Sequence, residues 1–149
     1  MRKKGVIGDF LKIELGDGFH AYARLLDGSN FAFYNKRANC DIPLDEIKNM
    51  EIAFTIAVMG DAVKGGGWSV IGNVPLDEKL KTIPPKFTQD IFDKNKFRIF
   101  ENGEFRSATK AECEGLERSA VWSRVHVEDR LRDYFSGLEN KWVKSLSIK

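Results

Sequence analysis

The stretch FLKIELGDGFHAYARLLDGSNFAFY, residues 10–34, decides the class of fold to which the chain belongs. Apolar and polar side chains alternate through FLKIEL, which is the period of a half-buried β-strand. The glycine-containing turns GDG and DGSN separate this segment from two further strand candidates, residues 19–26 and 31–34. Because short turns of this kind join antiparallel neighbours, the stretch predicts a three-stranded antiparallel meander.

Further strand candidates follow the meander along the chain. EIAFTIAVM, residues 51–59, is apolar or small on both faces, as in a central or doubly covered strand, and WSVIG, residues 68–72, is another candidate. FRIFENGEFRS, residues 97–107, places an Asn-Gly turn between apolar and aromatic residues, which predicts a β-hairpin. The proline-containing segment 73–96 predicts an irregular connection with one short helical turn.

Helix signals are concentrated in the last third of the chain. Thr109 and Glu112 form a T-x-x-E capping box, which predicts the start of a short helix. A longer helix is predicted between Ser123, as its N-cap, and Gly137, as its C-terminal stop. The segment 140–146 predicts a last helical turn that an asparagine caps.

Strands that precede helices predict an α+β fold. In this fold a curved antiparallel sheet, built from the N-terminal meander and the later hairpin, is packed by the C-terminal helices on one face or end. The composition, 42% hydrophobic and 31% charged, is that of an ordinary globular protein. We therefore expect one domain over residues 1–149.

The bulk composition also limits the class of function. The net charge of +2, with 24 basic residues against 22 acidic ones, lacks the imbalance of a dedicated nucleic-acid binder. The two cysteines, Cys40 and Cys113, are too few for a disulfide framework. The sequence has no apolar run typical of a signal peptide or a membrane span. We expect a cytoplasmic protein without a membrane partner, and the pattern leaves the oligomeric state open.

The stretch HVEDRLRDYF, which begins at His126, is the first candidate for chemistry because it combines a histidine with acids and arginines. On a helical wheel His126, Asp129 and Asp133 share one strip. No HExxH motif or second histidine is near, so a metal or acid–base site is the weaker hypothesis. We expect a solvated face with a Glu128–Arg132 pair, and a partner-binding face is the main alternative. The residues predicted to pack inward are Val127, Leu131, Tyr134, Phe135 and Leu138.

The stretch AVKGGGWSV, residues 62–70, is the second candidate, because the backbone amides of a glycine-rich loop can bind phosphate. Its lysine precedes the glycines and a strand follows, whereas a phosphate loop requires GxxxxGK[ST] before a helix. We therefore expect a plain loop between two strands, with Trp68 as a core or rim aromatic. GxSxG and catalytic-thiol contexts are also missing. The sequence predicts no enzyme and assigns no catalytic, metal-binding or cofactor-binding residue.

A binding module is the class of function that remains. His20, Tyr22 and Arg24 share one face of the strand 19–26 and are a predicted contact patch, since Tyr and Arg often dominate interfaces. A nucleic-acid-binding module that uses the N-terminal antiparallel sheet is the alternative function. Solubility is the more usual role of surface cations, which makes nucleic acid an unlikely partner. The basic residues that could contact phosphates are Arg2, Lys3, Lys4, Lys94, Lys96 and Arg98.

Several segments together resemble the immunity protein 26 family: IGDFLKIELGDGFHAYARLL, WSVIGNVPL, PPKFTQDIF, ECEGLERSAVWSRVHVEDRLRDYFSG and NKWVKSL. They follow the family's order and span nearly the whole chain. The resemblance implies an α+β immunity protein of bacterial polymorphic toxin or contact-dependent growth inhibition systems. Such a protein binds and neutralises a cognate toxin domain encoded by the neighbouring gene. The resemblance also implies that the protein occludes the toxin's active site in the cytosol and needs no cofactor.

The resemblance brings no defined set of contact residues, so the candidates come from the residues themselves. Local acidic groups are candidates for attracting a basic toxin. These groups are Asp41, Asp45, Glu46, Glu51 and the run Glu112–Glu117. The candidate partner-binding residues are His20, Tyr22, Arg24, Trp68, His126, Asp129 and Asp133.

Overall fold

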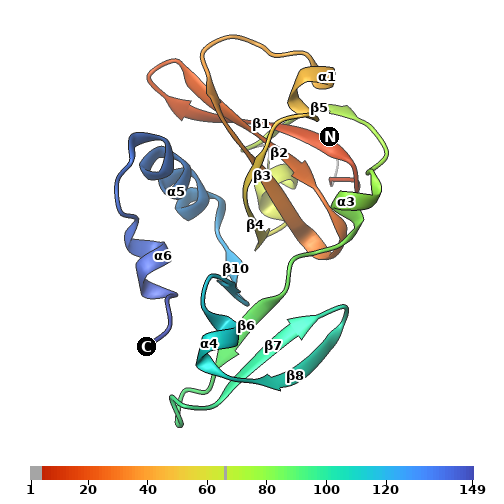
Figure 1. Ribbon diagram of the computed structural model, residues 1–149. Helices are drawn as coiled ribbons and strands as arrows, with labels where there is room; N and C mark the ends of the chain where they lie inside the picture. The colour runs from red at the N-terminus through yellow and green to blue at the C-terminus, as the bar shows by residue number, and fades with distance from the viewer. Residues whose placement is uncertain (1–4, 66) are drawn as a thin grey trace.

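The N-terminal meander is present and forms the centre of a six-stranded sheet (Figure 1). The computed structural model describes residues 5–65 and 67–149. Strands β1, β2 and β3 pair antiparallel in sequence order, as the alternation in residues 10–34 predicts. The residues of the sequence analysis that lie outside the described part are Arg2, Lys3, Lys4 and Gly66.

Three more strands extend the meander on both sides, to give the order β10-β4-β3-β2-β1-β5. β4 pairs antiparallel with β3 and β5 antiparallel with β1, whereas the short β10 is parallel to β4. The strand predictions for residues 51–59 and 68–72 are thereby confirmed. The strands of this sheet are β1 Asp9–Gly16, β2 Phe19–Leu25, β3 Asn30–Ala38, β4 Ile52–Val58, β5 Ser69–Asn73 and β10 Val121–Trp122.

The predicted hairpin is also present, but it belongs to a second, four-stranded sheet with the order β8-β7-β6-β9 (Figure 1). The strands of this sheet are β6 Lys86–Gln89, β7 Phe97–Glu101, β8 Glu104–Ala108 and β9 Glu117–Arg118. β6 lies in the segment expected to be irregular. Two prolines directly precede it, and its 4 residues are too few for a recognisable alternation.

Within the described residues, six short to medium helices complete the fold, and the α+β prediction is confirmed. Their bounds are α1 Leu44–Ile47, α2 Asp61–Lys64, α3 Glu78–Lys81, α4 Lys110–Cys113, α5 Arg124–Ser136 and α6 Lys141–Ser145, with a 3-10 turn η1 at Asp27–Ser29. α3 is the short helical turn expected in residues 73–96. α1 and α2 are single turns between strands, which the sequence pattern did not predict.

The caps predicted from the sequence define the last three helices. Thr109 and Glu112 form both hydrogen bonds of a capping box at α4. Ser123 caps α5, and Gly137 ends it with a φ of 69°, a left-handed conformation that glycine adopts without strain. Asn140 accepts hydrogen bonds from two backbone amides of α6. These three predictions are confirmed, because each depends only on contacts between neighbours in sequence.

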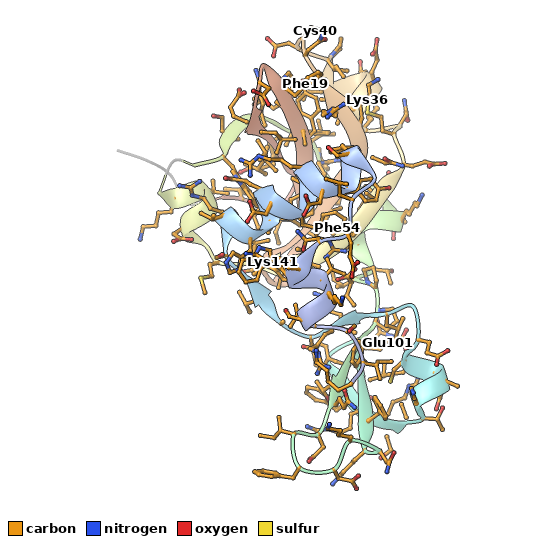
Figure 2. All side chains as sticks on the ribbon, turned by 90° about the vertical axis from the view of Figure 1, so that its left-hand side faces the viewer. Phe19, Lys36, Cys40, Phe54, Glu101 and Lys141 are labelled. Carbon is orange, nitrogen blue, oxygen red and sulfur yellow. The ribbon has the colours of Figure 1, made fainter. Side chains whose placement is uncertain are left out.

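The six-stranded sheet is covered on both of its faces. One face packs against α5 and α6, which cross in front of the sheet in Figure 2. The core on that face includes Phe33, Trp68, Trp122, Val127 and Leu131. The opposite face packs beneath α1, and its buried residues are Phe10, Tyr22, Tyr34, Ala38 and Ile47. The strands at the centre of this sheet therefore bury side chains on both sides.

The four-stranded sheet has a smaller core on one face, beneath α4. Its buried residues are Phe87, Phe97, Ile99 and Cys113. Two polar contacts join this sheet to the larger one. Arg130 of α5 donates two hydrogen bonds to Glu117 of β9, at 3.0 and 2.7 Å. Lys86 of β6 donates a hydrogen bond to the side chain of Asn30 at the start of β3.

Candidate partner-binding site

The predicted contact patch on β2 is buried. His20, Tyr22 and Arg24 expose 4%, 1% and 2% of their surface. His20 Nε2 and Tyr22 Oη are hydrogen-bonded at 2.7 Å, and burial raises the pKa of Tyr22 above its ordinary value. Arg24 donates from Nε to the carbonyl of Gly8 at 3.0 Å and from Nη2 to the carbonyl of Val74 at 2.6 Å. The prediction of an open patch is therefore wrong for the free protein.

The segment 39–51, which contains α1, covers these side chains. Its Ile42 amide donates a hydrogen bond to Tyr22 Oη at 3.1 Å, and Ile47 is fully buried in the same cluster. The alternation along β2 does place the three residues on one face, but it does not reveal that a later segment folds over that face. With both faces covered, the described strands of the N-terminal sheet present no open aromatic platform for nucleic acid.

Trp68 belongs to the core and not to a surface. Its side chain is 2% exposed and meets the rings of Phe31 and Phe33 edge to face, at centroid distances of 5.4 and 5.8 Å. Its indole nitrogen donates to Glu128 Oε2 at 3.0 Å, so β5 is tied to α5. The structure confirms the interpretation of Trp68 as a core aromatic.

His126, Asp129 and Asp133 do share one strip of α5, as predicted, but α6 covers that strip. The His126 ring stacks on Trp142 with a centroid distance of 3.6 Å. The Trp142 indole nitrogen donates to Asp129 Oδ2 at 3.2 Å, and the Asn140 amide donates to Asp133 Oδ2 at 2.9 Å. The three residues are half-buried, so the face expected to be solvated is only partly so. The strip attaches α6 to α5.

The expected Glu128–Arg132 pair is also absent from the described contacts. Glu128 Oε2 accepts from Arg124 at 3.0 Å as well as from Trp68. Arg132 pairs with Asp129 at 3.1 Å and donates to the carbonyl of Leu15 at 2.8 Å. Other local pairs within α5, together with tertiary contacts to Trp68 and to β1, thus replace the pair that the helical spacing suggested.

The C-terminal end of α5 carries an open apolar groove. Val127 and Leu131 are buried as predicted, but Tyr134 and Leu138 are 42% and 64% exposed, which corrects the predicted inner stripe. With Val143 of α6 they line a groove of about 440 Å³. Tyr134 meets the ring of Phe54 at a centroid distance of 6.2 Å and Phe135 packs against the core, so the last turn of the apolar stripe is only partly open.

A second open surface lies on the four-stranded sheet. The face opposite its core, called here the outer face, carries Arg98 and Phe100 of β7 with Phe105 and Ser107 of β8. The loop of residues 90–96 between β6 and β7 continues this surface. Of this loop only the basic residues Lys94 and Lys96 were candidates from the sequence, although the adjacent Ile91 and Phe92 between two aspartates were a usable signal.

The acidic candidates are largely engaged within the chain. Lys12 binds Asp41 at 2.9 Å, which holds the pKa of Asp41 below its ordinary value. Asp45 lies 3.5 Å from Lys48. The amide of Thr109, and after it the guanidinium of Arg106, lowers the pKa of Glu112. Contacts of this kind reduce the charge that these groups offer to a partner.

The described residues were searched for metal ligands, reactive thiols and membrane spans. Residues 5–65 and 67–149 contain no group of three His, Cys, Asp or Glu side chains that could hold a metal ion. Cys113 is buried, and burial raises the pKa of its thiol and disfavours the reactive thiolate. Within the same ranges, no helix is long and apolar enough to cross a membrane.

Comparison with known proteins gives one match. The family described as Immunity protein 26 matches residues 6–98, which is more than half of the chain. Neither a curated protein nor a solved structure matches. The match runs from just before β1 into β7, so α5 and α6 lie outside it. The family resemblance is thus confirmed for the part of the chain from β1 to the start of β7. The match does not extend to the C-terminal helices.

Proposed function

Because the chain belongs to the immunity protein 26 family, we propose that it binds and neutralises a cognate bacterial toxin domain encoded by the neighbouring gene. The family match over residues 6–98 is the single observation that carries this proposal. The protein acts as an inhibitor in the cytosol, where it protects the cell that makes the toxin. It performs no catalysis of its own.

Inhibition works by occlusion, in which the protein covers the toxin's active site and excludes its substrate. A standard protein interface uses about 800 Å² of each partner. The exposed surface of this chain is 9068 Å², so one face of it is enough to form such an interface. The six-stranded sheet, covered on both faces, and the helices tied to it support this mechanism, because a rigid scaffold loses little conformational entropy on binding.

Long-range charge attraction has a minor role in this complex. The net charge of +2 is too small to draw a charged partner to the whole molecule. Electrostatic steering of the toxin domain therefore depends on charged groups near the contact surface. The affinity instead depends on buried apolar and arginine contacts, which usually dominate interface energies.

Coexpression and inhibition assays test the proposal. The C-terminal domain of the protein encoded by the neighbouring gene should arrest growth alone, and coexpression of this chain should restore growth. Mixing the purified proteins should give a one-to-one complex and abolish the toxin's activity in competition with its substrate. Full toxin activity in the presence of saturating chain would contradict the proposal, as would a neighbouring gene that encodes no secreted protein with a variable C-terminal domain.

A further inference from the structure

The β6–β7 loop, residues 90–96, presents two large apolar side chains entirely to solvent. Ile91 is 85% exposed and Phe92 is 92% exposed, the two highest values among the exposed large hydrophobic residues. The loop forms the end of the molecule farthest from the six-stranded sheet (Figure 1). Single exposed apolar residues are common, but two adjacent ones at a protruding tip indicate a contact surface.

The loop is held in one conformation by its own polar groups. The Asp90 carboxylate accepts hydrogen bonds from the amides of Phe92 and Asp93, at 2.8 and 2.9 Å. The Asp93 carboxylate accepts from the amide of Asn95 at 3.0 Å. Gln89 donates to the carbonyl of Lys94 at 2.9 Å. A side chain presented on a loop fixed in this way binds with a smaller loss of conformational entropy.

The outer face extends the apolar surface away from the tip. Phe105 is 51% exposed and lies 4.8 Å, centroid to centroid, from Phe100 on the neighbouring strand. The guanidinium of Arg98 lies 4.8 Å from the Phe105 ring centroid. Arg98 is also directly opposite Thr88 and Ser107 in the sheet, so all of these side chains share the outer face. Aromatic and arginine side chains are the types enriched at interface centres.

Unpaired positive charge borders the apolar residues. Lys94, Lys96 and Arg98 form no ion pair within the described residues, whereas the carboxylates of Asp90 and Asp93 are bound to backbone amides. With three cations against these two carboxylates, the border of the apolar anchors, called here the cationic rim, carries a small excess of positive charge. The complement of this surface is an apolar pocket whose border carries carboxylates.

We propose that the β6–β7 loop and the outer face bind the toxin domain, with Ile91 and Phe92 inserted into an apolar pocket bordered by carboxylates. This inference rests on the proposed function and names the surface through which that function operates. The α5–α6 groove is the rival surface, but its apolar residues lack a comparable fixed protrusion. The groove therefore supplies the control variant.

Substitution at the tip tests the apolar part of the proposal. Phe92→Ala removes an exposed ring, so the variant folds as the wild type does. Its dissociation constant for the purified C-terminal domain of the neighbouring gene's product should rise about 30-fold or more, as for an interface hot spot. Leu138→Ala in the α5–α6 groove is the matched control and should change the constant less than about threefold. Calorimetric titration measures both.

Charge reversal tests the cationic rim. Lys94→Glu combined with Lys96→Glu should slow association by about tenfold at low salt and weaken its dependence on ionic strength. Lys36→Glu combined with Lys64→Glu makes the same change of charge outside the proposed surface, and Lys36 lies at the opposite end of the molecule (Figure 2). This control should leave the association rate within about twofold of the wild type.

The outcomes separate the inference from the proposed function. Wild-type affinity in Phe92→Ala, with tight binding by the wild type, overturns the inference and leaves the proposed function intact. Loss of binding in Leu138→Ala alone assigns the toxin to the α5–α6 groove and also overturns it. Phe92-dependent binding to anionic phospholipid vesicles or to a single-stranded oligonucleotide, with unchanged toxin affinity, overturns it in favour of that partner. A wild type that does not bind the domain overturns both proposals.

Discussion

Arg24 in the six-stranded sheet and Arg98 in the four-stranded sheet each stack on a phenylalanine, and these two pairs are in opposite settings. In the six-stranded sheet Arg24 lies 4.0 Å from the centroid of Phe10, and its guanidinium also donates to two backbone carbonyls. In the four-stranded sheet Arg98 lies 4.8 Å from the centroid of Phe105 and is exposed. The same residue types are thus structural in one pair and available to a partner in the other. Each sheet also holds a pair of the opposite kind: Arg37 on Phe19 is exposed, and Arg118 on Phe87 donates to two backbone carbonyls.

The difference arises from what covers each sheet. α1 and its flanking segment cover the Arg24 face of the larger sheet, while α5 and α6 cover the other. The smaller sheet has its core on its inner face, beneath α4. On its outer face Lys86 is buried against Asn30, whereas Arg98 is exposed, as is β8 along almost its whole length. Residue type alone therefore does not identify a contact surface, because coverage by later segments decides which side chains a partner can reach.

The largest expected effect separates the two arginines. Arg24→Ala removes the hydrogen bonds to the carbonyls of Gly8 and Val74 together with the packing on Phe10, and should lower the free energy of unfolding by about 3 kcal/mol. Arg98→Ala removes an exposed side chain and should change it by less than about 0.5 kcal/mol. Urea denaturation of both variants measures this contrast. Equal destabilisation would refute the distinction between the two sheets.

The next effect concerns the joint between the sheets. Arg130 donates two hydrogen bonds to Glu117 and lies 3.7 Å from the Phe54 ring centroid. Arg130→Ala should therefore cost about 2 kcal/mol of stability. Arg130→Lys keeps the charge but loses the paired hydrogen bonds, and should cost about half as much. Thermal unfolding of both variants checks the order, and a wild-type melting temperature in Arg130→Ala would show that the joint is not stabilising.

A smaller effect is expected where α6 covers α5. Trp142→Phe retains an aromatic ring against His126 but removes the indole hydrogen bond to Asp129, and should lower the free energy of unfolding by about 1 kcal/mol. Lys144→Ala, at an exposed position of the same helix, is the control and should have an effect within about 0.5 kcal/mol. Guanidinium denaturation compares the two. If the variants are equally stable, the polar strip of α5 does not hold α6 in place.

The smallest effect is a pH dependence at Lys86. Burial holds the pKa of Lys86 below its ordinary 10.5, and the carboxylate of Glu117 partly opposes this shift. The unfolded chain therefore binds the proton more tightly than the folded one, so stability rises as the pH climbs from the folded pKa toward 10.5. We expect the wild type to gain stability relative to Lys86→Met over this range. Equilibrium unfolding at several alkaline pH values tests this, and parallel profiles would contradict it.

Local patterns in the sequence were enough to predict most elements. The meander follows from alternation and glycine turns, the hairpin from Asn102-Gly103, and α5 from Ser123 and Gly137. Each of these signals depends on residues that are close in sequence. β6 gave no such signal, because it is short and becomes a strand only by pairing with β7 and β9.

The surfaces were harder to predict than the elements, because they depend on contacts between distant segments. His126, Asp129 and Asp133 share a strip, but nothing in α5 itself shows that Trp142 will cover it. In the opposite direction, Phe92 is exposed because no later segment folds over the β6–β7 loop. Helical or strand period determines which side chains share a face, and tertiary packing determines whether that face is open.

The central claim is that the four-stranded sheet is the open, partner-binding half of the molecule. Amide hydrogen exchange tests this claim most directly when it is measured on the chain alone and on its complex with the toxin domain. We expect exchange in the complex to slow in the β6–β7 loop and along β8, while β2 and its neighbours keep the rates of the free protein. Slowing confined to the α5–α6 groove or to α1, with the loop unchanged, would contradict this account.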